Sequence, residues 1–137
     1  GDPETQPVLM VFRGDFAKLL HSAAIGELDL SAIDSIAEGT ACNVVLASGG
    51  YPGAYDKGKE ITGIHEAEQS GTVIVFHAGT AEHEGKLVTS GGRVLGVCAP
   101  GSTLHEAVAQ AYAAVEHIHF DGMMYRTDIG KKELERG

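Results

Sequence analysis

The sequence has 137 residues, of which 43% are hydrophobic and 21% charged, a balance typical of one globular domain with a core of its own. Its formal net charge of −9 argues against a nucleic-acid or anionic-membrane surface, because such surfaces need basic patches. No apolar run approaches the roughly 20 residues that cross a bilayer, and there is no signal-peptide pattern. We therefore expect a cytoplasmic protein with neither nucleic acid nor membrane as a partner.

The first part of the chain predicts helix. Residues 3–25 place apolar side chains on one stripe at helical spacing, and Pro7 and Gly14 indicate a break into two shorter helices. A glycine at position 26 is a typical helix stop. Residues 27–40 have a mixed polar composition and predict a connection, which divides the chain into units 1–27 and 28–137. The stripe consists of Phe12, Phe16, Leu19, Leu20 and Ala23.

From Thr40 onward, short apolar or β-branched runs between glycine turns predict strands in an antiparallel meander. Glu84 and Gly85 form a candidate two-residue hairpin turn. A short strand near Ile61 and a helical turn over 64–69 are also expected. The predicted strands cover 42–47, 72–77, 81–83, 86–89 and 93–98.

The clearest predicted helix covers residues 103–118. Thr103 and Glu106 make a capping box at its start. Its buried stripe is predicted to contain Leu104, Val108, Ala111, Val115 and Ile118. The predicted fold class is therefore α+β, with a helical element before an antiparallel sheet.

Neither the cysteines nor the histidines form a metal or redox motif. Cys42 and Cys98 lie in apolar runs without a CxxC spacing, which predicts two buried free thiols. The stretch Gly53 to Lys59 has the GxxxxGK spacing of a phosphate-binding loop, but Glu60 stands where a serine or threonine must ligate magnesium. We therefore predict a simple loop there, and no nucleotide site in this chain.

The segment Ser90-Gly91-Gly92-Arg93 is a candidate anion site. Two glycines allow a ligand to approach the backbone, and Arg93 then begins a strand. If that strand pairs with the preceding one, Lys86 and Arg93 converge on one anion. The alternative is a tight hairpin with two solvated cations. Asp2 and Glu4 either cap a helix or contact a metal or cationic substrate group, and their spacing does not decide between these roles.

Several long strings of this sequence, in this order, resemble the C-terminal part of the phosphoribosylamine–glycine ligase family, also called glycinamide ribonucleotide synthetases. The resemblance runs nearly end to end. The strings are Gly1-Asp2-Pro3-Glu4-Thr5-Gln6, Leu46-Ala47-Ser48-Gly49-Gly50-Tyr51-Pro52-Gly53, Val75-Phe76-His77-Ala78-Gly79-Thr80, Ser90-Gly91-Gly92-Arg93-Val94-Leu95-Gly96-Val97, Tyr125-Arg126 and Asp128-Ile129-Gly130.

The resemblance implies an ATP-grasp ligase that activates glycine as an acyl phosphate for attack by 5-phosphoribosylamine. ATP and Mg²⁺ or Mn²⁺ would serve the full-length enzyme, whose Glu and Asn metal ligands fall before Gly1. A fragment with residues 1–27 from the end of the ATP-grasp domain would bind neither and be inactive alone. Residues 28–137 would form a C-terminal domain that resembles a rudimentary single-hybrid motif.

The resemblance also implies roles for single residues. Lys86 and Arg93 stand at the distances before Leu95-Gly96-Val97 at which a related transformylase grips its substrate phosphate, with Gly91 and Gly92 between them. Asp2 would border the glycine site and Glu4 the metal site. The expected partners are phosphoribosylamine, glycine and the missing N-terminal portion. Two alternatives are a stand-alone module that binds a phosphorylated ribose derivative and a purely structural domain.

Overall fold

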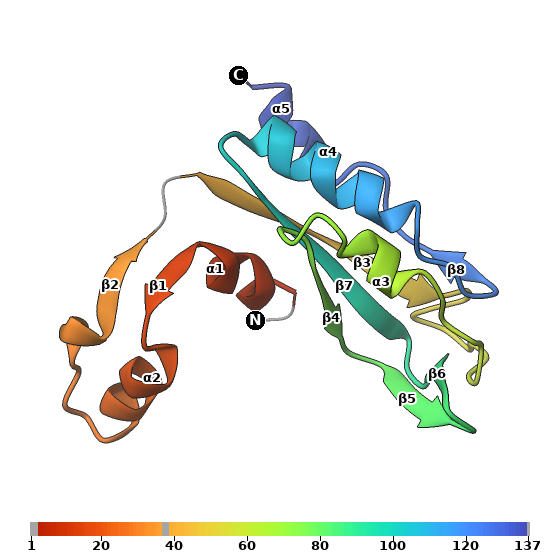
Figure 1. The fold of residues 1–137 in the computed structure, drawn as a ribbon, viewed down its shortest axis with the longest axis horizontal. Helices are drawn as coiled ribbons and strands as arrows, with labels where there is room; N and C mark the ends of the chain where they lie inside the picture. Colours follow the sequence, from red (N-terminus) through yellow and green to blue (C-terminus); the bar gives the residue numbers. More distant parts are fainter. Residues whose placement is uncertain (1–2, 37–38, 137) are drawn as a thin grey trace.

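A four-stranded antiparallel sheet forms the centre of the computed structural model, which describes residues 3–36 and 39–136, without the side chains of residues 35 and 36 (Figure 1). The long strands β3 and β7 pair in the middle of this sheet, from Thr40 opposite Gly101 to Ala47 opposite Arg93. The strands, in spatial order, are β4 (Ile74–His77), β7 (Arg93–Gly101), β3 (Thr40–Ser48) and β8 (Met123–Met124).

The predicted meander is wrong in its connectivity, because β7 lies between β3 and β4 instead of at an edge. The strand is buried on both faces from Val94 to Ala99, which is the pattern of a central strand. Burial of the whole core determines which strands become neighbours in the sheet. The local sequence pattern therefore predicted where the strands lie in the chain but not their order in the sheet.

A second pair of strands, β5 (Thr80–His83) and β6 (Lys86–Thr89), extends the β4–β7 pair as a two-stranded arm (Figure 1). The predicted hairpin turn is confirmed: Glu84 and Gly85 both have positive φ, as the usual two-residue turn requires. The expected strand near Ile61 is present as an isolated bridge between Glu60 and Val88.

Helix α4 (Leu104–Val115) covers one face of the sheet. The predicted cap is confirmed at Thr103, whose Oγ1 accepts from the Glu106 N–H at 3.2 Å. The Glu106 carboxylate, however, accepts from the backbone N–H and the hydroxyl of Ser102, one residue earlier than the capping box requires.

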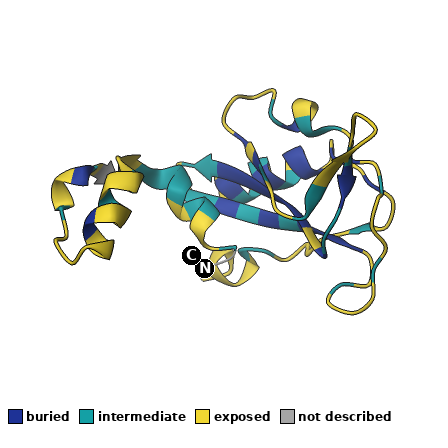
Figure 2. Cartoon of the chain, turned by 90° about the horizontal axis from the view of Figure 1, so that it is seen from below, coloured by how far each residue is buried: buried dark blue, intermediate teal, exposed yellow. Residues whose placement is uncertain are grey.

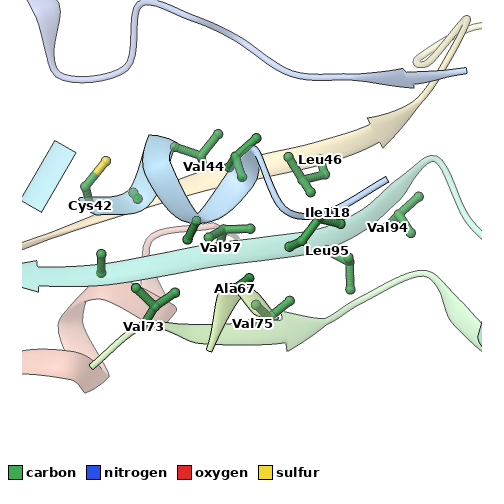
Figure 3. Packing of buried hydrophobic residues seen from close by; sticks show 14 of the residues in the cluster. Cys42, Val44, Leu46, Ala67, Val73, Val75, Val94, Leu95, Val97 and Ile118 are labelled. Atoms are coloured by element: carbon green, nitrogen blue, oxygen red, sulfur yellow. The ribbon is translucent and has the colours of Figure 1, made fainter. Parts of the chain in front are cut away.

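The face of α4 that meets the sheet differs from the predicted stripe. Ala111, Val115 and Ile118 are buried as expected, whereas Leu104 and Val108 are only partly buried. Ala107 and Ala114 take central positions, because small side chains let the helix approach the sheet closely. The core lies between the two layers, with Val44, Leu46, Leu95, Val97 and Ile118 among its members (Figure 3).

The other face of the sheet is covered by α1 (Thr5–Val11), which packs on β3 and β7. After α1 the chain forms a small lobe from residues 12 to 36. It contains β1 (Phe12–Gly14), α2 (Phe16–Ala24), η1 (Leu30–Ala32) and β2 (Ile33–Ile36). The remaining short helices are α3 (Ile64–Ala67), at the predicted helical turn, and α5 (Lys131–Leu134).

The two predicted N-terminal helices are confirmed, but their boundary and the segment after them differ. Pro7 lies in the first turn of α1, where a missing N–H costs no hydrogen bond, so the break comes at β1. Because Phe12 lies in that strand, there is no continuous stripe over the two helices, although its ring contacts Phe16. Residues 27–40 are not a plain connection, since β2 pairs with β1 across position 27.

The small lobe has almost no interior. Among its described side chains only Ser22 and Ala32 are buried. Four large apolar side chains are 55–63% exposed, and the lobe stands apart from the main body (Figure 2). We call these four residues the lobe patch: Leu20, Ile25, Leu28 and Leu30. No helix of the described part of the chain is long and apolar enough to cross a membrane.

The contrast between the two parts predicts different costs of truncation. Leu46 is fully buried in the core, so Leu46→Ala should lower the free energy of unfolding by about 2–4 kcal/mol. Leu20→Ala removes the same atoms from an exposed site and should change it by less than about 0.5 kcal/mol. Urea denaturation followed by circular dichroism measures both, and equal losses would contradict this assignment of the core.

Candidate functional site

The loop from Ser90 to Gly92 is held in place by hydrogen bonds from two neighbouring segments. The Ser48 hydroxyl donates to the Gly91 carbonyl at 2.9 Å, and the Ser48 N–H donates to the Gly92 carbonyl at 2.8 Å. On the other side, the Ser90 N–H donates to the Gly79 carbonyl at 2.7 Å. The loop is therefore a rigid base for Arg93, the first residue of β7.

The two glycines of this loop allow close packing against other parts of the protein. A Cβ at Gly92 would lie 2.2 Å from Cδ2 of Tyr51, and one at Gly91 would lie 3.0 Å from the Gly79 Cα. The Tyr51 ring meets that of Tyr55 edge to face, with centroids 6.3 Å apart. Both glycines thus have a packing role, whereas the sequence suggested ligand approach.

Lys86 and Arg93 lie on strands that do not pair with each other. Strand β6 pairs with β5, and β7 pairs with β3 and β4, so the strand pairing on which convergence of the two cations depended is absent. The ammonium group of Lys86 instead lies 2.7 Å from Oε2 of Glu60, with 60% of the Lys86 side chain exposed. Arg93 is exposed at the start of β7, outside the arm.

Arg93 lines a small cavity of about 10 Å³ between the N-terminal segment and the sheet. The Asn43 side chain donates through Nδ2 to the Pro3 carbonyl at 3.3 Å and so ties that segment to β3. Two amide oxygens here, Gln6 Oε1 and Asn43 Oδ1, are buried without a hydrogen-bond partner. The lining residues are Pro3, Gln6, Asn43, Val45, Phe76, Ala78, Arg93, Leu95 and Gly96.

Sequence reasoning missed Gln6 and Asn43. The available signal was a single amide side chain, Asn43, inside the otherwise apolar run of β3. A polar residue at such a position needs a partner in the fold. Its partner is the backbone of Pro3, 40 residues away in sequence, which no local pattern predicts.

The acidic residues of the N-terminus contribute little to the described site. Asp2 lies outside the described residues. Glu4 precedes α1, is exposed and makes no side-chain cap hydrogen bond. Among residues 3–36 and 39–136, no three His, Cys, Asp or Glu side chains gather where they could hold a metal ion.

The stretch Gly53 to Lys59, which nearly matches a phosphate-binding motif, is an irregular loop in the structure, as predicted. Lys59 lies 3.2 Å from a carboxylate oxygen of Asp121, and its backbone N–H donates to the Thr89 hydroxyl. The chain continues from Lys59 into the bridge between Glu60 and Val88, and not into a helix. The loop therefore lacks the helix N-terminus that such phosphate sites use.

The two cysteines are buried free thiols, as predicted. Burial, with a smaller contribution from nearby Cys42, raises the pKa of the Cys98 thiol to about 12. Burial also raises the pKa of Cys42. Since the thiolate is the reactive form, neither thiol is a nucleophile at neutral pH.

Comparison with known proteins first defines the class. The fold is similar to a solved structure of phosphoribosylamine–glycine ligase from Thermotoga maritima, with a TM-score of 0.77 and 40% identity over 93% of this chain and 30% of that chain. The class is therefore that of a mixed helix and antiparallel-sheet domain similar to part of that structure.

The family follows from the sequence comparisons. Residues 41–132 match the family model described as phosphoribosylglycinamide synthetase, C domain, and the chain belongs to this family. It is 52% identical over 98% of its length to phosphoribosylamine–glycine ligase of Synechocystis sp., and 46% identical over 99% to the chloroplastic ligase of Arabidopsis thaliana. The chain spans 32% and 26% of the lengths of these two relatives.

The raised pKa of Cys98 predicts a pH dependence of stability. The native thiol keeps its proton up to about pH 12, while the unfolded thiol loses it near its ordinary pKa of 9.0. Its contribution is therefore complete below pH 9 and is lost as the pH rises from 9 toward 12. Denaturation of the wild type and of Cys98→Ala across this range should show a shallower decline in the variant. Identical slopes would contradict the burial of this thiol.

Proposed function

We propose that this chain is the substrate-side part of a phosphoribosylamine–glycine ligase. The complete enzyme would join glycine to 5-phosphoribosylamine, converting ATP to ADP and phosphate and forming glycinamide ribonucleotide for purine synthesis. The observation that carries the proposal is the 52% identity to such a ligase along 98% of the chain. ATP and Mg²⁺ or Mn²⁺ would be bound by the portion of the ligase not included in these 137 residues, and the enzyme would act in the cytoplasm.

Arg93 is the proposed anchor for the substrate phosphate. It follows a loop that is held in place by three hydrogen bonds to backbone carbonyls. The backbone from which the Arg93 guanidinium extends is therefore fixed in position. Such a handle supplies binding energy remote from the reacting atoms and positions the amine for attack on the acyl phosphate. Gly91 and Gly92 give the loop its shape. Lys86 would join only by leaving Glu60, and Asp2 would border the glycine site.

Residues 1–27 are proposed to be the end of the ATP-grasp domain. Because β2 pairs with β1, this unit would extend to Ile36 and include the small lobe. The lobe patch supports this assignment, because four exposed apolar side chains on a lobe without an interior need a covering surface. The predicted C-terminal domain, residues 28–137, would then begin after β2, with a core related to a single-hybrid motif. If the chain instead acts alone, it would bind a phosphorylated ribose derivative without turnover.

Replacing the proposed phosphate anchor should weaken substrate binding selectively. In the full-length ligase, Arg93→Ala should raise KM for phosphoribosylamine roughly 10- to 150-fold, the equivalent of a lost charged hydrogen bond of about 1.5–3 kcal/mol. KM for glycine and for ATP should stay the same. Arg126→Ala is the matched control, because this arginine is exposed and pairs with Asp128. An unchanged KM for phosphoribosylamine would remove Arg93 from the site.

Mixing experiments test whether this chain needs the N-terminal portion of the ligase for turnover. With ATP, magnesium, glycine and freshly generated phosphoribosylamine, this chain alone should release no ADP, and adding the matching N-terminal portion should produce turnover. The double variant Leu20→Ser and Leu28→Ser should require more of that portion for the same rate, since both lie in the lobe patch. Turnover by the chain alone would contradict the proposal, while binding of ribose 5-phosphate without complementation would favour the stand-alone module.

A further inference from the structure

The cavity beneath α1 is lined by two amide side chains whose oxygens accept no hydrogen bond. Gln6 Oε1 and Asn43 Oδ1 are both buried without a partner, and both residues line the cavity. The orientation of Asn43 follows from its other bond, because Nδ2 donates to the Pro3 carbonyl and leaves Oδ1 as the unpaired atom. A buried acceptor without a donor costs about 1–3 kcal/mol, so two of them in one cavity require an explanation.

Gly96 of β7 leaves space for the Asn43 amide on the sheet surface. A Cβ at Gly96 would lie 2.8 Å from Asn43 Oδ1, so a larger residue there would require the amide to shift. Across the cavity Gln6 projects from α1, a helix in which no described residue is fully buried. Apolar packing alone therefore holds α1 weakly, and polar contacts at its start gain weight.

We propose that one water molecule occupies this cavity and donates its two hydrogens to Gln6 Oε1 and Asn43 Oδ1. The volume of about 10 Å³ is at the size needed for a single water and is too small for an organic ligand. A water has two donors, which matches the two acceptors. It bridges α1 and β3 beside the direct bond from Asn43 to Pro3, and so clasps the N-terminal segment to the sheet.

A monovalent cation is the competing occupant, because amide oxygens also coordinate such ions. Arg93 also lines this cavity, and its positive charge disfavours a cation there. Two oxygens are also fewer ligands than an alkali ion needs. The neutral donor is therefore favoured. The inference is independent of the proposed ligase activity, since it concerns only how α1 is attached.

A high-resolution crystal structure of this chain tests the occupant directly. The expected result is a density peak within about 3.2 Å of both Gln6 Oε1 and Asn43 Oδ1, without an anomalous signal after soaking in rubidium chloride. An empty cavity overturns the proposal, and so does a rubidium peak between the two oxygens.

The sign of a stability change tests it in solution. Gln6→Met keeps the side-chain length and removes the acceptor. If water bridges the two amides, the variant loses that bond, and its equilibrium constant for folding should fall roughly fivefold. Gln69→Met, at an exposed position, should leave it unchanged. An unchanged or raised stability of Gln6→Met would mean that the oxygen is unsatisfied in the native protein, which overturns the proposal.

Discussion

The pairing of β3 with β7 is the constraint on which the rest of this structure depends. It joins segments more than 45 residues apart and gives the sheet two faces. One face receives α4 and the apolar core, and the other receives α1. The same pairing brings Arg93 to the end of β3, where Ser48 holds the loop before it. The position of the candidate site and the stability of the core therefore both depend on the register of the β3–β7 pair.

The two parts of the molecule have different relations to their surroundings. The main body buries a continuous cluster from Cys42 to Phe120 and has the interior of an ordinary domain. The lobe of residues 12–36 has local order, with Asp29 accepting from Ser31 and bonded to Lys18, but exposes its large apolar side chains. Hydrogen bonds from Ser31 and from the Lys18 ammonium lower the pKa of Asp29 to about 2, so this carboxylate keeps its charge to lower pH than an unpaired one. Local polar contacts shape the lobe, while its large apolar side chains stay exposed.

The candidate site illustrates how glycine serves two purposes in one loop. Gly92 accommodates the Tyr51 ring, and the packed loop then fixes the origin of Arg93. A ligand-binding interpretation and a packing interpretation of such a motif are therefore compatible, because a rigid loop is what a positioned guanidinium needs. The surroundings of Arg93 differ from the sequence-based expectation, because Lys86 is bound to Glu60 and Arg93 lines a cavity with Pro3 and Gln6.

Features that depend on a few neighbouring residues were predictable from the sequence. The cap at Thr103, the Glu84-Gly85 turn, the two N-terminal helices and the burial of both cysteines follow from local geometry and apolar patterning. The complete fold was needed to establish the order of the strands, the pairing of β2 with β1, the separation of Lys86 from Arg93 and the role of Asn43. The strand pairs and the bond from Asn43 to Pro3 join residues from about 20 to more than 50 positions apart. They follow from burying one core with all segments present, which no local propensity encodes.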